Sequence, residues 1–251
     1  MSAFSALSQA GYRAHVRDKT TLFFVFAFPL MFLVVFGLLF QGETVDESGK
    51  KYIDYTAPGV MSWGIANAAV FGIGFVLMQW RRDDILRLIR MSPAPLTAVL
   101  GSRYLLAVAI GLAQAVLFLS VALLPVFGMT LAGTWPLAVP IVVLGITAFL
   151  AIGAIVGSYA RTPESVAAIA NCLIVPMAFL SGSFFPLDSM PEWLRTLSRI
   201  FPLRYFNDGL SAAITGDGSG RDMLVSCGGL AAYTLVFGLI AMKTFRWSDN
   251  S

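Results

Sequence analysis

Charged residues are scarce in this 251-residue chain. Only 12% of the residues are Asp, Glu, Lys or Arg, whereas 57% are hydrophobic. Soluble domains contain about 25% charged and about 45–50% apolar residues. The composition therefore excludes an ordinary soluble domain and indicates a protein embedded in a lipid bilayer. Because apolar runs take up most of the sequence, we expect a single membrane domain over residues 1–251.

Histidine and cysteine are nearly missing as well, which excludes several kinds of catalytic site. The only histidine, His15, precedes the first long apolar run. One histidine outside the membrane provides neither a His-rich zinc site nor a Ser-His-Asp triad. The two cysteines, Cys172 and Cys227, lack the spacing of a disulfide framework or a metal site, and we interpret both as packing residues. We expect no catalytic residue, no metal site and no cofactor in this chain.

Six apolar runs are long enough to span a membrane. A helix needs about 20 residues to cross a hydrocarbon core about 30 Å thick. None of the six runs contains Asp, Glu, Lys, Arg or His. We therefore predict an all-α, polytopic protein with six transmembrane helices. The runs are 21–40, 57–79, 104–127, 136–158, 166–183 and 223–242.

Lys and Arg are distributed unevenly over the segments that connect these runs. Eleven of them lie in segments 1–20, 80–103, 159–165 and 243–251, and the other connecting segments hold six. Cytoplasmic loops of membrane proteins are enriched in Lys and Arg. Both termini are therefore predicted to be cytoplasmic.

The uncharged spans also limit how such a protein could be powered. Proton- and ion-coupled transporters usually carry ionisable side chains at membrane depth. The chain also lacks the phosphate-binding pattern G-x-x-x-x-G-K-[ST]. If this protein moves a solute uphill, the free energy must therefore enter from another subunit.

The segment that precedes the first span is a candidate surface for receiving that energy. Residues 4–20 have apolar residues at helical spacing, with Arg13 and Arg17 elsewhere on the helix. This pattern is typical of a basic amphipathic helix that lies on the inner leaflet. The alternative is a positively charged membrane anchor without a partner.

A second candidate surface follows the second span, where a short helix is predicted within 80–95. Asp83 and Asp84 lie at its start, where the helix dipole favours negative charge. Arg87 and Arg90 lie at its end, where the dipole favours positive charge, and a Pro-x-Pro segment then terminates it. A short, rigid helix between two spans can transmit motion from a partner. The alternative is an ordinary solvated loop.

Amphipathic helices are also predicted between the fifth and sixth spans. Pro202 separates two apolar stripes there. We expect both helices to lie in the outer interface or to dip partly into the membrane. The stripes are Trp193, Leu194, Leu197, Ile200 and Phe201, then Phe206, Leu210, Ala213 and Ile214.

A few polar side chains lie within the spans and must find partners away from lipid. They are Asn67, Gln114 and Asn171. They form hydrogen bonds between helices in one interpretation and contact a substrate in the other.

Large apolar side chains in the second and fifth spans allow the same two interpretations. They either pack between helices or form an adaptable wall for amphiphilic cargo. These candidates for the substrate pathway are Phe71, Met78, Met177 and Phe179.

The chain resembles the type-2 ABC export permeases, and among them the daunorubicin-resistance type. The resemblance rests on six spans, on Ser92-Pro93-Ala94-Pro95-Leu96-Thr97, and on a segment running from Phe185-Pro186 through Met190-Pro191-Glu192-Trp193-Leu194 to Phe201-Pro202-Leu203. Two features depart from the family pattern. Arg81-Arg82-Asp83-Asp84-Ile85 replaces an acidic Glu-Arg-Glu-type start, and Phe201-Pro202 replaces the commoner Asn-Pro.

The resemblance implies a permease that pairs with itself or with a second permease. Two ATPase subunits, which bind ATP and Mg, would dock against the N-terminal helix and Asp83–Arg90. The substrate path would follow the seam between the permeases, lined by the second and fifth spans, which favours Asn67 and Asn171 for substrate contact.

The resemblance also implies a function and a location. The expected activity is export of a hydrophobic or amphiphilic small molecule, such as a drug, an antibiotic or a lipid-like compound. The chain would reside in the cytoplasmic membrane of a bacterium or archaeon, with membrane lipid and no nucleic acid among its partners. The alternative function is a scaffold or sensor that binds a cytoplasmic partner without transport.

Overall fold

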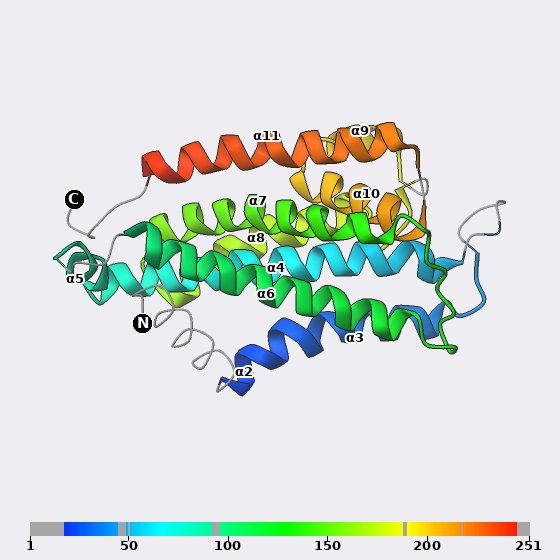
Figure 1. Ribbon diagram of the computed structural model, residues 1–251, viewed down its shortest axis with the longest axis horizontal. Helices are drawn as coiled ribbons and strands as arrows, with labels where there is room; N and C mark the ends of the chain where they lie inside the picture. Colours follow the sequence, from blue (N-terminus) through cyan, green and yellow to red (C-terminus); the bar gives the residue numbers. More distant parts are fainter. Residues whose placement is uncertain are drawn as a thin grey trace.

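The computed structural model describes residues 18–44, 49, 51–91, 96–187, 190–216 and 218–244. Six helical stretches in this part are long and apolar enough to cross a membrane, which confirms the predicted architecture. Figure 1 shows them running side by side along the long axis of the molecule. The stretches are Lys19–Leu39, Tyr52–Arg82, Ala98–Ala122, Trp135–Tyr159, Pro163–Leu180 and Gly220–Thr244.

The first span is built from three consecutive elements. These are α2 (Lys19–Leu22), a π-helical turn η1 (Phe23–Ala27) and α3 (Phe28–Leu39). The irregular turn precedes Pro29, which has no N–H to donate to the carbonyl of Val25 four residues earlier. The proline therefore leaves a carbonyl at membrane depth that needs a donor from elsewhere.

The second and third spans differ in extent from the sequence prediction. α4 (Tyr52–Arg82) begins five residues before the predicted run, because Tyr52 and Asp54 are buried at its start. α6 (Leu96–Ala122) begins earlier and ends earlier than predicted. Residues 123–127 form turns instead of helix, since Pro125 cannot continue a helix and Gly128 follows at φ 62.

The remaining spans are close to their predicted positions. The fourth span consists of a 3-10 turn η2 (Trp135–Leu137) and α7 (Ala138–Tyr159). The fifth span is α8 (Pro163–Leu180) and the sixth is α11 (Gly220–Thr244). Cys227 packs against the core as expected from its position, whereas Cys172 is exposed on α8, so the interpretation of that cysteine as a packing residue was wrong.

α4 and α7 form the centre of the bundle and approach each other closely. A Cβ atom added to Gly153 would lie 2.6 Å from the carbonyl oxygen of Val70, and one added to Gly157 would lie 2.7 Å from that of Gly74. Small residues allow membrane helices to pack backbone against backbone in this way. The glycines of α7 therefore set the distance between the two central helices.

Two helices lie between the fifth and sixth spans, as predicted: α9 (Glu192–Ser198) and α10 (Pro202–Thr215). The predicted stripe of α10, including Phe206 and Leu210, is fully buried against α4, α7 and α11. The first stripe instead remains partly exposed, at Trp193 in α9 and at Ile200 just after it. α10 is thus a packed part of the bundle, and it lies beside α7 and α11 in Figure 1.

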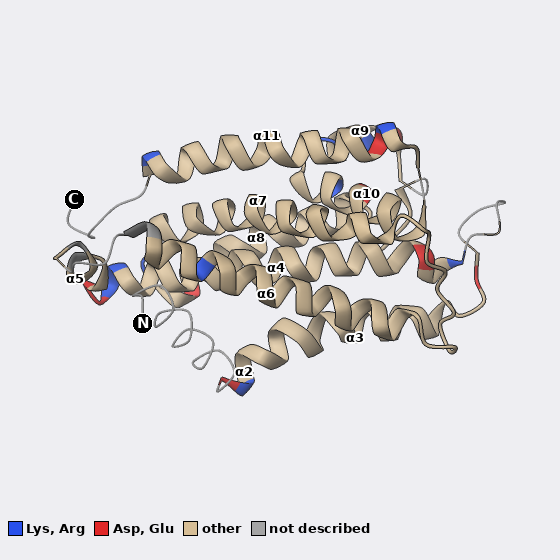
Figure 2. Cartoon of the chain, viewed as in Figure 1, with Lys and Arg blue, Asp and Glu red and all other residues tan. Residues whose placement is uncertain are grey.

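Charged residues gather at the two ends of the bundle, with a long uncharged stretch between them (Figure 2). One end, which we call the basic end, contains the turn after α4 and the connection from α7 to α8. The opposite end contains the start of α4 and the start of α11. The assignment of the basic end to the cytoplasm stays a prediction.

The predicted N-terminal helix, with Arg13 and Arg17, lies outside the described residues except for its last three positions. There Asp18 caps α2, since its carboxylate accepts a hydrogen bond of 3.1 Å from the backbone N–H of Thr21.

Candidate functional site

A cavity of about 750 Å³ opens between the first span, α4 and α6. α7 contributes Leu150 and α8 contributes Ala167 and Asn171 to its wall. The volume falls within the range of about 300–1,000 Å³ that is usual for sites of drug-sized ligands. The cavity is therefore large enough for a small-molecule substrate.

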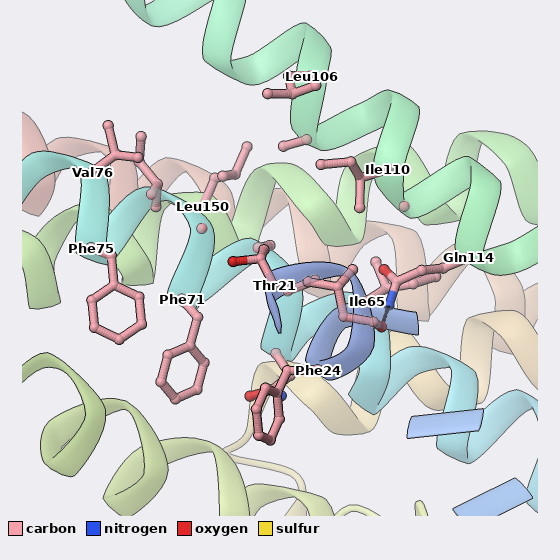
Figure 3. A pocket seen from close by; sticks show the side chains of 18 of the residues that line it. Thr21, Phe24, Ile65, Phe71, Phe75, Val76, Leu106, Ile110, Gln114 and Leu150 are labelled. Atoms are coloured by element: carbon pink, nitrogen blue, oxygen red, sulfur yellow. Dashed lines mark hydrogen bonds between the residues drawn. The ribbon is translucent and has the colours of Figure 1, made fainter. Parts of the chain in front are cut away.

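The wall is largely apolar and aromatic. On α6, Leu106 and Ile110 recur at helical spacing on one face and line the cavity. On α4, the rings of Phe71 and Phe75 are tilted against each other with their centroids 5.6 Å apart, and Phe24 adds a third ring from the first span. Figure 3 shows these side chains around the cavity. Such a surface suits an apolar or amphiphilic ligand.

Gln114 closes the cavity wall where the first span is irregular. Its Nε2 donates to the carbonyl oxygen of Val25 at 2.7 Å, the bond drawn in Figure 3, and more weakly to that of Gly64 at 3.4 Å. Val25 is the residue whose carbonyl loses its helical donor to Pro29. Gln114 thus replaces the missing backbone donor and ties α6 to the first span, which fulfils the interhelical interpretation of this residue.

Arg103 is a cavity residue that sequence reasoning missed. It was assigned to a connecting segment, but α6 begins at Leu96 and carries Arg103 into the cavity wall. Its guanidinium carbon lies 5.1 Å from the centroid of the Trp80 ring, a cation–π contact. The available signal was the helical spacing of Arg103 from Leu106 and Ile110, which continues the apolar face of the third span.

The structure brings together three of the six predicted pathway residues. Asn67, Phe71 and Asn171 line the cavity. The other three lie elsewhere: Met78 is buried in the core, Met177 packs against it, and Phe179 is half-exposed, with its ring 5.2 Å from that of Phe184. Substrate contact stays a prediction for all six.

A cluster of aromatic rings separates the cavity from the opposite end of the bundle. Phe28 lines the cavity and contacts Phe32, with ring centroids 5.2 Å apart. Trp63 lies 5.2 Å from Phe32 and 5.2 Å from Phe184. These rings join the first span, α4 and the segment after α8.

Hydrogen bonds from α4 fix the segment that follows α8. The Tyr52 hydroxyl donates to the carbonyl oxygen of Phe184 at 2.8 Å, and the Tyr55 hydroxyl donates to that of Gly182 at 2.6 Å. Asp54 holds the neighbouring loop, because its carboxylate accepts from the backbone N–H of Thr130 at 2.9 Å. The opposite end is therefore closed by a network centred on the first turn of α4.

At the basic end, the predicted short helix is confirmed with different bounds. α4 continues through Arg82, the chain turns at Asp83 and Asp84, and α5 (Ile85–Met91) follows. Asp84 has φ 53, in the left-handed region that Asp tolerates better than most residues. Both aspartates are exposed at the turn. Their role in coupling, and that of Arg87 and Arg90 within α5, stays a prediction.

Arg81 connects this turn to the two helices beyond it, which the sequence did not reveal. Its guanidinium donates to the carbonyl oxygens of Ser158 and, at 3.0 Å, Ala160. These carbonyls lie where α7 ends, three residues before α8 begins at Pro163. Arg81 is only 5% exposed, and a buried guanidinium bonded to helix-terminal carbonyls is a rigid connection.

Comparison with known proteins agrees with this arrangement. Residues 2–215 match the model of the ABC-2 type transporter family. Relatives include the putative transport permease YvfS of Bacillus subtilis, 23% identical over 254 residues and 96% of each chain. The inner membrane transport permease YadH of Escherichia coli is 20% identical over 86% of this chain and 83% of its own.

A third relative is named for a resistance function. The linearmycin resistance permease protein LnrN of Bacillus subtilis is 28% identical over 112 residues, which cover 44% of this chain and 29% of LnrN. The family match extends over most of this chain. The chain therefore belongs to the ABC-2 type transporter family. It is a multi-pass permease of the bacterial cytoplasmic membrane, in the class of membrane subunits of ABC transporters.

Proposed function

We propose that this chain is the membrane subunit of an ATP-driven exporter for a hydrophobic or amphiphilic small molecule. The observation that carries the proposal is the largely apolar cavity of about 750 Å³ between the spans of an ABC-2 permease. A pocket with aromatic walls and a few polar groups is typical of sites that bind drug-sized ligands. The resistance named for one relative is consistent with such a cargo.

The energy for transport would come from ATPase subunits docked at the basic end. ABC-2 permeases work with ABC ATPase partners, and we propose two copies that bind ATP and Mg beneath a pair of permeases. α5 is the surface offered to them, since the turn at Asp83 and Asp84 exposes its start.

Arg81 gives this docking surface a route into the membrane. A push on α5 reaches the end of α4 through the turn, and Arg81 couples that end to the junction of α7 and α8. α8 contributes Asn171 to the cavity and α4 contributes Asn67 and Phe71. Movement of α5 would therefore change the positions of cavity walls.

The competing function, a scaffold or sensor that docks a partner without transport, uses the same turn and α5. A scaffold or sensor gives no role to the cavity between the spans. The cavity, its aromatic wall and the aromatic cluster beyond it favour transport over a purely scaffolding role.

The proposal is tested by filling the cavity. A Cβ atom added to Gly72, in the cavity wall on α4, meets nothing within 4 Å, so Gly72→Trp introduces a bulky side chain at the cavity without a clash at its Cβ. The matched control is Gly238→Trp on α11, whose Cβ also meets nothing within 4 Å and which lies outside the cavity wall.

Both variants are co-reconstituted in vesicles with the cognate ATPase subunit, and ATP-dependent movement is measured over a panel of apolar and amphiphilic compounds. We expect Gly72→Trp to lose at least tenfold in transport rate and Gly238→Trp to match the unmodified chain. Equal transport by both variants would remove the cavity from the pathway.

A further inference from the structure

The cavity is largely apolar and has a cation at one end, which narrows the class of ligand it can take. Of the described residues that line it, Arg103 alone carries a charge. Gln114, in the same face of α6, lies eleven residues further on, about 16 Å along the helix. The cavity thus has a positive end near the basic end of the bundle and a long, neutral remainder.

Among the described residues, no Asp or Glu lies within ion-pair distance of Arg103. Its guanidinium lies over the face of the Trp80 ring. A cation–π contact leaves the edge of the guanidinium plane and its N–H donors available. An arginine within a membrane helix is costly unless it meets an anion, a carbonyl or water.

The shape of the guanidinium determines which anion fits. Its fork of N–H groups matches the two oxygens of a carboxylate or of a phosphate. The rings of Phe24, Phe71 and Phe75 and the apolar face of α6 then provide a surface for a hydrocarbon body. A neutral or cationic amphiphile would fill the apolar part and leave Arg103 unpaired.

We propose that the cavity binds an anionic amphiphile, with its carboxylate or phosphate on Arg103 and its apolar body along α4 and α6. Only the statement that this ligand is the transported cargo rests on the proposed function; binding of the ligand does not. The same headgroup chemistry is available from a free acid or from an anionic bilayer lipid that enters the cavity.

The test measures binding by the purified chain in nanodiscs of zwitterionic lipid, without ATPase or ATP. The probes are a fluorescent fatty acid and its uncharged methyl amide, and saturable binding is measured against empty nanodiscs. The variants are Arg103→Gln, the charge-conserving Arg103→Lys, and the control Arg161→Gln, an exposed arginine outside the cavity wall.

The unmodified chain should bind the fatty acid at least tenfold more tightly than the amide, a difference of about 1.4 kcal/mol, because the amide cannot form the ion contact with Arg103. Arg103→Gln should lose this preference while its affinity for the amide is unchanged. Arg103→Lys should keep part of the preference and Arg161→Gln all of it. Unchanged amide binding also shows that the variants are folded.

Two results would overturn the inference: equal binding of acid and amide by the unmodified chain, or a preference for the acid that survives in Arg103→Gln. Adding anionic phospholipid to the nanodiscs identifies the source of the headgroup. Displacement of the acid assigns the site to a bilayer lipid, and its retention assigns the site to a free amphiphile; either result upholds an anion site at Arg103. Because no ATP is used, failure of the exporter proposal would appear separately, as absent transport by the full complex.

Discussion

The two sides of α4 are packed in opposite ways. Toward α7, backbone meets backbone at Gly153 and Gly157, and no space remains between the helices. Toward α6 and the first span, the helices diverge around a cavity of about 750 Å³. The helices on the two sides differ in burial in the same way, since 50% of the apolar stretch of Trp135–Tyr159 is buried, against 28% in α6 and 17% in Lys19–Leu39.

This difference indicates that the two sides of α4 have different mechanical properties. The packed side, α4 with α7, has the properties of a rigid unit, because close-packed interfaces transmit displacement instead of absorbing it. The hollow side contains the candidate binding surface and the irregular first span. Movement of the packed unit against the loosely packed first span and α6 would change the cavity, and the predictions below separate the two sides.

The largest effect is expected from a bulky residue on the packed side. Gly153→Leu places its Cβ 2.6 Å from the Val70 carbonyl oxygen, so α4 and α7 must separate. We expect loss of the folded protein, a cost of more than about 4 kcal/mol. Size-exclusion profiles and thermal unfolding in detergent measure it.

The matched variant on the hollow side is Gly72→Leu, whose Cβ meets nothing within 4 Å. Its unfolding temperature should stay close to that of the unmodified chain. If the two leucine variants were equally stable, the contrast between the two sides of α4 would be wrong.

The next largest effect is expected where Arg81 connects the turn at Asp83 and Asp84 to the packed side of α4. Arg81→Gln removes the guanidinium from the carbonyls of Ser158 and Ala160, so movement of α5 is no longer passed to α7 and α8. We expect transported cargo per ATP hydrolysed to fall about tenfold, a change of about 1.4 kcal/mol in coupling.

The neighbouring Arg82→Gln is the control, because Arg82 is exposed at the same end of α4. The ratio of transport to hydrolysis, measured in the reconstituted complex, is the readout. A proportional loss of transport and hydrolysis in Arg81→Gln would indicate a folding defect instead of uncoupling.

The smallest effect is expected where the hollow side is stabilised by one hydrogen bond. Gln114→Leu removes the donor to the Val25 carbonyl and should cost about 1 kcal/mol. In a Pro29→Ala background, the backbone N–H of residue 29 can donate to the Val25 carbonyl instead. Gln114→Leu should therefore reduce the free energy of unfolding by less in that background.

Thermal unfolding of the four chains of this double-mutant cycle gives the coupling energy. Additive effects of Pro29→Ala and Gln114→Leu would show that Gln114 does not replace the donor that the proline lacks.

The sequence predicted the spans well because each is a continuous apolar run. The prediction failed for polar residues near the span ends whose hydrogen-bond partners lie far away in the sequence. Asp54 and Arg81 were assigned to connecting segments, yet both are buried within α4, with partners at Thr130 and at Ser158 and Ala160. Such pairings depend on tertiary packing and leave no local pattern.

The candidate site was predictable only in part for the same reason. Asn67 and Asn171 stood out as polar residues in apolar runs, and the structure brings both to the cavity. Met78 and Phe179 looked equally suitable but point elsewhere, because the choice between lining and packing is made by neighbouring helices. The cavity itself, being the space that the first span and α6 leave unfilled, has no signature in composition or periodicity.

The central claim is that the cavity is loaded and emptied by work done in a separate ATP-hydrolysing subunit. The most direct measurement is accumulation of an amphiphilic probe in liposomes that contain this chain alone or together with the ATPase subunit. The account predicts accumulation only when both proteins and ATP are present. Accumulation by the chain alone, driven by a pH or sodium gradient, would contradict it.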